Sequence, residues 1–205
     1  MTKIRSRQQV VDAAAKVFAE KGYDNARIED IAKELGVLQG SLYYHVSSKA
    51  ALLRLVTRQQ FTEVVVKLEK LVTGQEPPRE KLKKAILAQH RYVDRHRTAS
   101  PRWFTEAHDP RRTEIEAEED TRLLARYREA WKSILKDGIA AGDISPGIDP
   151  TITVLTLLGM CISPAAWPPP GPGRSPATMA ALQLHIAWSG LAAGSAADDA
   201  EAGPA

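Results

Sequence analysis

Apolar residues recur every three or four positions along most of this chain, which is the spacing of helices that bury one face. No segment alternates apolar and polar residues as a half-buried strand does. The chain is therefore predicted to be all-α, with about nine helices. They are expected at residues 5–21, 26–35, 38–45, from Ser47 or Ser48 to a break at 73–80, and at 77–97, 111–140, 151–163 and 176–192, with a short piece at 98–110.

Composition restricts the compartment and the number of domains. The 205 residues have room for one large domain or two small ones. A single cysteine, Cys161, excludes an internal disulfide bond and favours a reducing, cytoplasmic location. The first residues contain no apolar segment typical of a signal peptide, and no run of about 18 apolar residues predicts a membrane span.

The run GVLQGSLYYHV, residues 36–46, combines a short helix with an unusual number of hydrogen-bonding side chains. Leu38, Leu42 and Val46 share one face and are expected to face a core. The polar and aromatic side chains between these three residues lie mostly on the other faces of the helix. The helix before it and the glycine turn at Gly36 complete a helix-turn-helix unit, whose second helix enters the DNA major groove. The alternative is a solvated helix that carries surface tyrosines.

The residue types on this helix suit DNA. Gln39 can pair with an adenine edge through two hydrogen bonds. Lys49, at the start of the next helix, adds positive charge where the helix dipole already favours an anion. Hydroxyl and imidazole donors for phosphate oxygens, with aromatic faces for thymine methyl groups, are supplied by Ser41, Tyr43, Tyr44 and His45. Residues 1–60 also hold ten Lys or Arg against six Asp or Glu, which favours a polyanionic partner.

The spacing of residues 10–56 resembles the N-terminal domain of the TetR family of bacterial transcriptional repressors. The family pattern combines an alanine pair and a phenylalanine on the first helix, a Gly-Tyr turn, an Ile-Ala pair and the run G-V-x-x-G-x-L-Y-x-H before Ser-Lys. The matching positions are Ala13, Ala14, Phe18, Gly22, Tyr23, Ile31, Ala32, Gly36, Val37, Gly40, Leu42, Tyr43, His45, Ser48 and Lys49.

The chain departs from this pattern in a few places. Ala26 and Arg27 stand where the family usually has Thr or Ser, so a helix cap and a phosphate-contacting hydroxyl are missing, although Arg27 can reach a phosphate itself. Asp24 or Asn25 is the cap expected instead. Leu38 replaces a common serine cap, and Val46 replaces a common phenylalanine. The predicted DNA-contacting set is Arg27, Gln39, Gly40, Ser41, Tyr43, Tyr44, His45 and Lys49.

The resemblance implies a DNA-binding domain at residues 1–48 and an effector-binding and dimerisation domain at 49–194, before a tail at 195–205 whose composition predicts disorder. Helices 151–163 and 176–192 are apolar on more than one face, which favours a four-helix homodimer interface. Aromatic and thioether side chains that either line an effector cavity or simply fill the core are Trp103, Phe104, Tyr127, Trp131 and Met160.

The function implied is that of a ligand-responsive repressor that binds a palindromic operator as a homodimer and is released by a small hydrophobic effector. The Pro-Gly-rich loop at 166–176 is similar to a subgroup in which some members respond to acyl-coenzyme A esters. The alternatives are a constitutive helix-turn-helix protein without a ligand and an all-helical enzyme. No cofactor and no metal are expected: His90 and Asp94 share a face but lack a third ligand, and an ion-paired or solvated face is the other interpretation.

Overall fold

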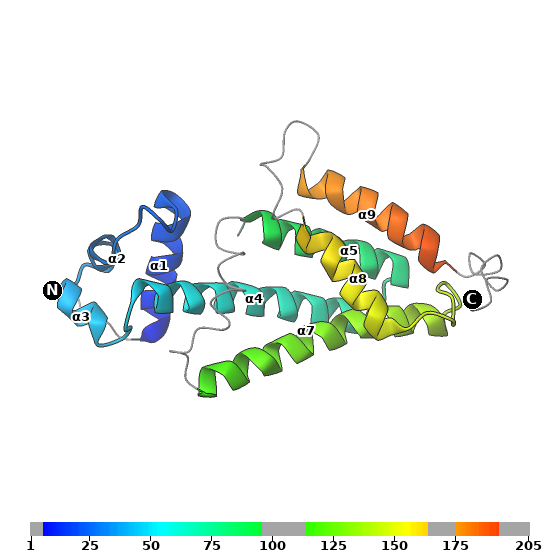
Figure 1. Ribbon diagram of the computed structural model, residues 1–205, viewed down its shortest axis with the longest axis horizontal. Coiled ribbons are helices and arrows are strands. Elements are labelled where there is room, and N and C mark those ends of the chain that lie inside the picture. The colour runs from blue at the N-terminus through cyan, green and yellow to red at the C-terminus, as the bar shows by residue number, and fades with distance from the viewer. Residues whose placement is uncertain (1–5, 96–113, 164–174, 193–205) are drawn as a thin grey trace, which may run out of the picture. The chain divides into compact units, whose positions relative to one another are not determined.

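The computed structural model describes residues 6–95, 114–163 and 175–192 (Figure 1). In these ranges the backbone forms helices and, apart from an isolated bridge between Ile144 and Ala192, no strand pairing, so the all-α prediction is confirmed. The predicted pieces at 98–110 and 195–205 lie outside the described residues. The helices are α1 (Arg7–Lys21), α2 (Ile28–Leu35), α3 (Gln39–Tyr43), α4 (Lys49–Thr73), α5 (Pro78–Arg95), α7 (Glu114–Ala140), α8 (Pro150–Ile162) and α9 (Pro176–Leu191).

The described chain divides into two compact units. We call residues 6–62 the N-terminal unit and the described residues from Glu63 onward the C-terminal unit. Helix α4 contributes its first half to one unit and its second half to the other. The domain boundary expected at residues 48 and 49 falls at the start of α4.

The N-terminal unit packs α1, α2, α3 and the first turns of α4 around one apolar core. Val10 and Ala14 of α1, Ile31 of α2, Leu42 of α3 and Leu52 of α4 are fully buried. Their spacing along each helix is the spacing that the sequence predicted, because residues three or four apart lie on one face. Leu42 is the buried side chain of α3, and it fixes the remaining side chains of that helix on the outside. The prediction that Leu38 faces the same core is wrong: its side chain is 58% exposed, because Leu38 precedes α3 as its N-cap with an extended backbone.

The turn between α2 and α3 depends on a glycine. Gly36 adopts φ +67°, in the left-handed region that favours glycine. The amide of Val37 then donates to the carbonyl of Ala32 at 3.0 Å, which closes the end of α2. The chain reverses within these residues, so α3 begins at Gln39 immediately after the turn.

The starts of α2 and α4 tested the predicted caps. The N-cap of α2 is Arg27, so the prediction of a cap at Asp24 or Asn25 is wrong. The helix end is stabilised from inside instead: Asp30 accepts a hydrogen bond from the amide of Arg27 at 2.9 Å. At α4 the hydroxyl of Ser48 accepts from the amide of Ala51 at 3.0 Å, so of Ser47 and Ser48, the two residues predicted to cap this helix, Ser48 is the cap.

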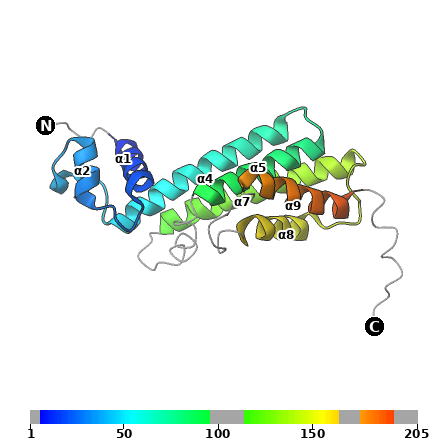
Figure 2. The same ribbon diagram turned by 90° about the horizontal axis from the view of Figure 1, so that it is seen from above.

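In the C-terminal unit α5 packs against α7, α8 and α9, and α7 also packs against α8 (Figures 1 and 2). Trp131 and Ile134 of α7 are fully buried, as are Leu82 and Ile86 of α5. The apolar spacing of residues 111–140 predicts that Leu124, Tyr127, Trp131, Ile134 and Leu135 lie along one side of α7. The last four are buried, but Leu124 is only half-buried and its neighbour Leu123 is buried instead.

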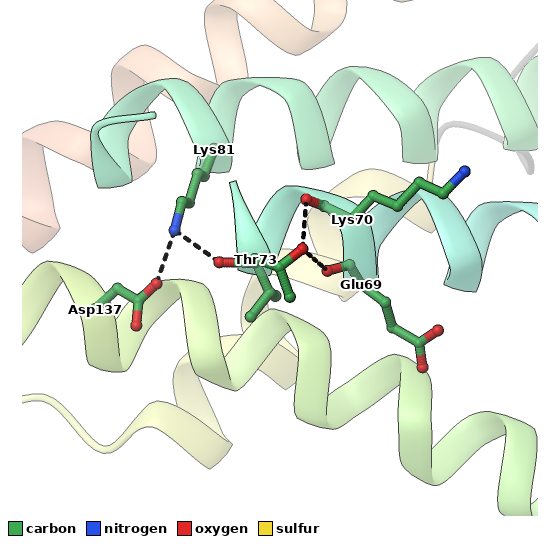
Figure 3. Close-up of polar contacts among 6 residues, drawn as sticks. Glu69, Lys70, Thr73, Lys81 and Asp137 are labelled. Carbon is green, nitrogen blue, oxygen red and sulfur yellow. Dashed lines mark hydrogen bonds and ion pairs between the residues drawn. The ribbon is translucent and has the colours of Figure 1, made fainter. Parts of the chain in front are cut away.

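The side chain of a buried lysine on α5 forms hydrogen bonds with α4 and with α7 (Figure 3). The ammonium group of Lys81, on α5, donates to the carbonyl oxygen of Val72 at 2.9 Å and to the carboxylate of Asp137 at 3.0 Å. Val72 belongs to the last turn of α4, where backbone carbonyls lack helical partners. Lys81 therefore satisfies the end of one helix and the acidic side chain of another at the same time.

Candidate DNA-binding surface and effector region

Two tyrosines are exposed to solvent at the C-terminal end of α3, Tyr43 on the helix and Tyr44 as its C-cap. Tyr44 is 92% exposed and Tyr43 is 51% exposed, while the side chain of Leu42, on the core-facing side of the helix, is fully buried. Aromatic side chains of this size normally bury most of their surface. Tyr43 at the end of α3 and Tyr44 directly after it contribute little to the core, and their surface is available to a partner.

The other predicted DNA-contacting residues lie around the same helix. Gly40 and Ser41 on α3 and Arg27 before α2 are exposed, and His45 is half-buried. Lys49 is half-buried: its ammonium lies 4.4 Å from the centroid of the Tyr23 ring and 3.3 Å from the carbonyl oxygen of Asp24. These contacts hold the charge of Lys49 at the start of α4.

Gln39 makes a hydrogen bond that the sequence did not predict. Its side-chain nitrogen Nε2 lies 2.6 Å from the carboxylate oxygen Oε1 of Glu29, on α2. The base-reading amide expected at this position is thus already oriented by a neighbouring helix. The sequence analysis did not single out Glu29, because an acidic residue in the first turn of a helix is explained by the helix dipole alone.

Gly40 has no steric reason of its own to be a glycine. It is exposed, its φ is not positive, and a Cβ placed on it meets no atom within 4 Å among the described residues other than its chain neighbours and the backbone of its own helix. Glycine inside a helix costs up to about 1 kcal/mol relative to alanine. The space over Gly40 therefore suits close approach of another molecule to the backbone of α3.

The C-terminal unit places two of the predicted effector residues together. The rings of Tyr127 and Trp131 on α7 are both buried and meet edge to face, with centroids 6.3 Å apart and planes at 75°. Met160, on α8, is half-buried. The other two predicted residues, Trp103 and Phe104, lie outside the described residues.

Polar groups accompany these aromatic rings. The hydroxyl of Tyr127 donates to Oε1 of Gln89, on α5, at 2.6 Å. Burial raises the pKa of the Tyr127 phenol well above its usual value, so it remains a neutral donor. The indole nitrogen of Trp131 is buried and has no hydrogen-bond partner of normal geometry among the described residues, although a weaker interaction with the Tyr127 hydroxyl acts against the rise of that pKa. Buried donors normally have acceptors, so this N–H is a candidate contact for a bound molecule.

A second buried polar cluster joins α5, α8 and α9. Nε2 of His90 lies 2.8 Å from Oε1 of Gln183, and Nε2 of Gln183 donates to the carbonyl of Met160 at 2.7 Å. The thiol of Cys161 donates to the same Oε1 at 3.4 Å. Burial raises the pKa of the Cys161 thiol to about 12, and burial lowers the pKa of His90 against the opposing effect of Gln183. Both side chains are therefore held neutral.

This cluster corrects the interpretation of His90 as part of a solvated or ion-paired face: the side chain is only 3% exposed and is bonded to an amide. Sequence gave no signal for Gln183, a polar residue among apolar ones on α9. The residues that the structure describes contain no group of three or more His, Cys, Asp or Glu side chains placed to hold a metal ion.

Two models of known protein families match this chain. The model of the bacterial regulatory proteins of the tetR family matches residues 10–56, which contain the helix-turn-helix. The model of the tetracyclin repressor-like C-terminal domain matches residues 75–191, more than half of the chain. The chain belongs to the TetR family.

Curated relatives of this TetR-family protein are regulators of similar length. It is 26% identical over 190 residues to the HTH-type transcriptional repressor KstR2 of Rhodococcus jostii strain RHA1, with 91% of each chain covered. It is 26% identical over 144 residues to the fatty acid metabolism regulator protein of Bacillus subtilis strain 168, which covers 69% of this chain and 72% of the relative.

Solved structures show the same fold. A TetR/AcrR-family regulator from Thermobifida fusca has a TM-score of 0.74 at 23% identity, covering 90% of this chain and 97% of the other. FadR of Bacillus subtilis in complex with stearoyl-CoA has a TM-score of 0.63 at 21% identity, covering 91% and 100%. AibR in complex with isovaleryl coenzyme A and operator DNA has a TM-score of 0.63 at 19% identity, covering 88% and 96%.

Two helices of this TetR-family protein expose apolar side chains. Ile152 and Leu155 of α8 and Leu182 and Ile186 of α9 are each more than half exposed. The predicted stripes were broader: Leu158 is buried in the core, and Ile162, Met179 and Trp188 are half-buried. In the described parts of the chain, no helix has the length and apolar character needed to cross a membrane.

Proposed function

We propose that this TetR-family regulator is a cytoplasmic homodimeric repressor that binds a palindromic operator through α3 and leaves it when an acyl-coenzyme A ester, or a similar hydrophobic anion, binds the C-terminal unit. The observation that carries the DNA-binding assignment is the exposure of Tyr43 and Tyr44 at the end of a short helix held to the core by Leu42. In a helix-turn-helix, this is the helix that enters the major groove.

The contacts assigned to DNA fall into two kinds. Tyr43, Tyr44 and Lys49 supply hydroxyls and a charge for the phosphate backbone, which fix the position of the protein on the duplex. Arg27, Ser41 and His45 are assigned to the same backbone-contacting set. Gln39 supplies the base-reading amide. Gly40 allows the backbone of α3 to come close to the DNA.

The effector assignment rests on α7 and the helices packed on it. Tyr127, Trp131 and Met160 provide apolar surface, and the buried Trp131 N–H, which has no hydrogen-bond partner of normal geometry among the described residues, provides a donor for a carbonyl or phosphate oxygen. Trp103 and Phe104 remain predicted members of this site. Two relatives with the same fold carry acyl-coenzyme A esters in their solved structures, which supports this ligand class.

Dimerisation is assigned to α8 and α9. Four exposed apolar side chains on two neighbouring helices leave a surface that a second copy can cover as a four-helix bundle. Gly159 is exposed and has open space where a Cβ would be, so it permits close approach of a partner helix. A twofold dimer presents two copies of α3 to the two halves of a palindrome.

The test is operator binding and release. Purified protein is titrated by fluorescence anisotropy with palindromes from the DNA upstream of its own gene, at several salt concentrations. We expect affinity to fall steeply with salt, and Lys49→Ala to weaken binding to all duplexes and lower the salt slope by about 1. Lys67→Ala, which removes the same charge from an exposed position on α4, should leave both unchanged. Failure of the wild type to prefer any duplex would refute the repressor assignment.

The effector is tested on the same complex. Acyl-coenzyme A esters of increasing chain length should dissociate the operator complex and raise the melting temperature, whereas free coenzyme A should do neither. At about a hundredfold excess over its dissociation constant, an effector adds about 2.7 kcal/mol of stability. Trp131→Phe should weaken the response, and Trp188→Phe should not. Tight operator binding that no ester changes would instead identify a constitutive DNA-binding protein.

A further inference from the structure

The acidic residues of α2 have different partners. Asp30 pairs with Lys21 at 2.5 Å, and Glu34 pairs with Lys16 at 2.6 Å. Glu29 instead accepts a hydrogen bond from the side-chain amide of Gln39 at 2.6 Å. An exposed carboxylate beside a DNA-binding helix repels phosphate and therefore lowers affinity for every sequence. A contribution to DNA affinity therefore does not explain why Glu29 is present at this position.

The contact determines which way the Gln39 amide faces. A carboxylate has acceptors only, whereas the glutamine amide has a carbonyl oxygen and an NH₂ group. The nitrogen Nε2 must therefore point to Glu29, because an oxygen in that place would face a second negative atom. Oε1 of Gln39 is left available, together with the second N–H of the amide.

This orientation selects among bases. In the major groove adenine presents N6–H₂ and cytosine presents N4–H₂, both donors that Oε1 can accept from. Guanine presents N7 and O6, and thymine presents O4, which are acceptors. To donate to guanine or thymine with both amide hydrogens, Gln39 would have to release Glu29. The Glu29 carboxylate is also repelled by these acceptor edges.

We propose that Glu29 is a specificity-determining residue: by holding the Gln39 amide, it restricts the position that Gln39 reads to a base with an exocyclic amine in the major groove, adenine or cytosine. This inference rests on the proposed role of α3 in the operator complex. Glu29 acts here as a positioning residue, and its effect is on the choice of base more than on overall affinity.

The experiment uses the full-length protein and a set of operators that differ at one base pair. Wild-type protein first defines the palindrome and the base pair at which Gln39→Ala loses discrimination. Glu29→Gln is then measured on all four bases at that position, symmetrically in both half-sites. Glu34→Gln is the matched control, because it removes the same charge from the same helix without touching Gln39. The double variant Glu29→Gln with Gln39→Ala tests whether Glu29 acts through Gln39.

We expect wild type and Glu34→Gln to prefer adenine or cytosine by about tenfold or more over guanine and thymine. Glu29→Gln should reduce that preference to about threefold or less and gain affinity for the disfavoured operators. In the Gln39→Ala background, adding Glu29→Gln should leave the base preference unchanged. The four-base comparison also distinguishes adenine from cytosine. A uniform gain on all four operators, equal to that of Glu34→Gln, would show that Glu29 acts by charge alone and overturn the proposal. Absence of any operator binding by wild type would instead be a failure of the proposed function.

Discussion

The imidazole of His90 on α5 donates its Nε2–H to the amide oxygen of Gln183 on α9 across 2.8 Å. The direction follows from the other end of the amide, because the nitrogen of Gln183 donates to the carbonyl of Met160 on α8 at 2.7 Å. One amide therefore joins three helices, and it requires His90 to carry its proton on Nε2.

This arrangement predicts a pH dependence of stability. Burial lowers the pKa of His90 in the folded state below its ordinary value of 6.5. As pH falls below about 6.5, the unfolded chain takes up a proton that the folded chain does not, so stability decreases until the lowered pKa is reached. His90→Gln keeps a donor for Gln183 and cannot titrate, so this loss should disappear. Urea unfolding at about pH 8 and about pH 5.5 measures it. The control His185→Gln, at an exposed site on α9, should lose as much stability between these two pH values as wild type does. The same loss of stability in His90→Gln would contradict the prediction.

Gly40→Ala should separate stability from DNA binding. Alanine is favoured over glycine in a helix by about 1 kcal/mol, and the added methyl meets no atom within 4 Å among the described residues outside its own helix and chain neighbours. The variant should therefore melt at the same temperature as wild type or slightly above it, while its operator affinity falls. Calorimetry and anisotropy on the same preparations measure both. Unchanged operator affinity would show that DNA does not approach α3 at this residue.

Leu182→Glu combined with Ile186→Glu should give monomers. Both side chains are more than half exposed, so the charges are solvated in one chain and become buried only when a partner covers α9. Sedimentation should show the loss of dimers, and binding to a palindrome should fall together with it. Val66→Glu makes the same kind of change on α4 and should leave the dimer intact. A double variant that stays dimeric would place the interface on other helices.

Lys81→Met should lower the free energy of unfolding by about 1–3 kcal/mol, because it leaves the carbonyl of Val72 and the carboxylate of Asp137 without this donor. Lys84→Met, on the same helix, breaks an exposed pair with Glu76 and should cost at most about 1 kcal/mol. Denaturant unfolding of both variants makes the comparison. Equal losses would mean that the buried position of Lys81 adds nothing.

The helices and the outward-facing residues of α3 followed from sequence because both depend on local spacing. Leu42 and Val46, four positions apart, are buried as predicted, and Tyr44 lies away from them. Leu38 was predicted on the same face but is exposed, because it is the extended N-cap residue and the helical spacing does not apply to it. The same argument gave the wrong neighbour on α7, where Leu123 and not Leu124 is buried, because adjacent residues differ by about 100° around a helix.

The polar pairs could not be predicted in this way. His90 and Gln183 are 93 residues apart in sequence, and neither residue type indicates that the side chain is buried or which partner it contacts. Lys81 has the sequence context of an exposed lysine on a charged helix, yet it is buried by the end of α4. Gln39 was expected to read DNA, but its contact with Glu29 depends on how the turn at Gly36 places two helices. Which polar groups meet is set by tertiary packing, and periodicity carries no information about it.

The attachment of α3 through Leu42 has a consequence for how such a regulator changes its target over evolutionary time. Surface substitutions away from the core usually alter stability by no more than about 0.5 kcal/mol. Gln39, Ser41, Tyr43 and Tyr44 carry none of the core packing of this helix, so they can be exchanged while Leu42 keeps the scaffold folded. A new operator is then accessible through a few neutral steps on one short segment, and the helices that sense the effector need not change with it.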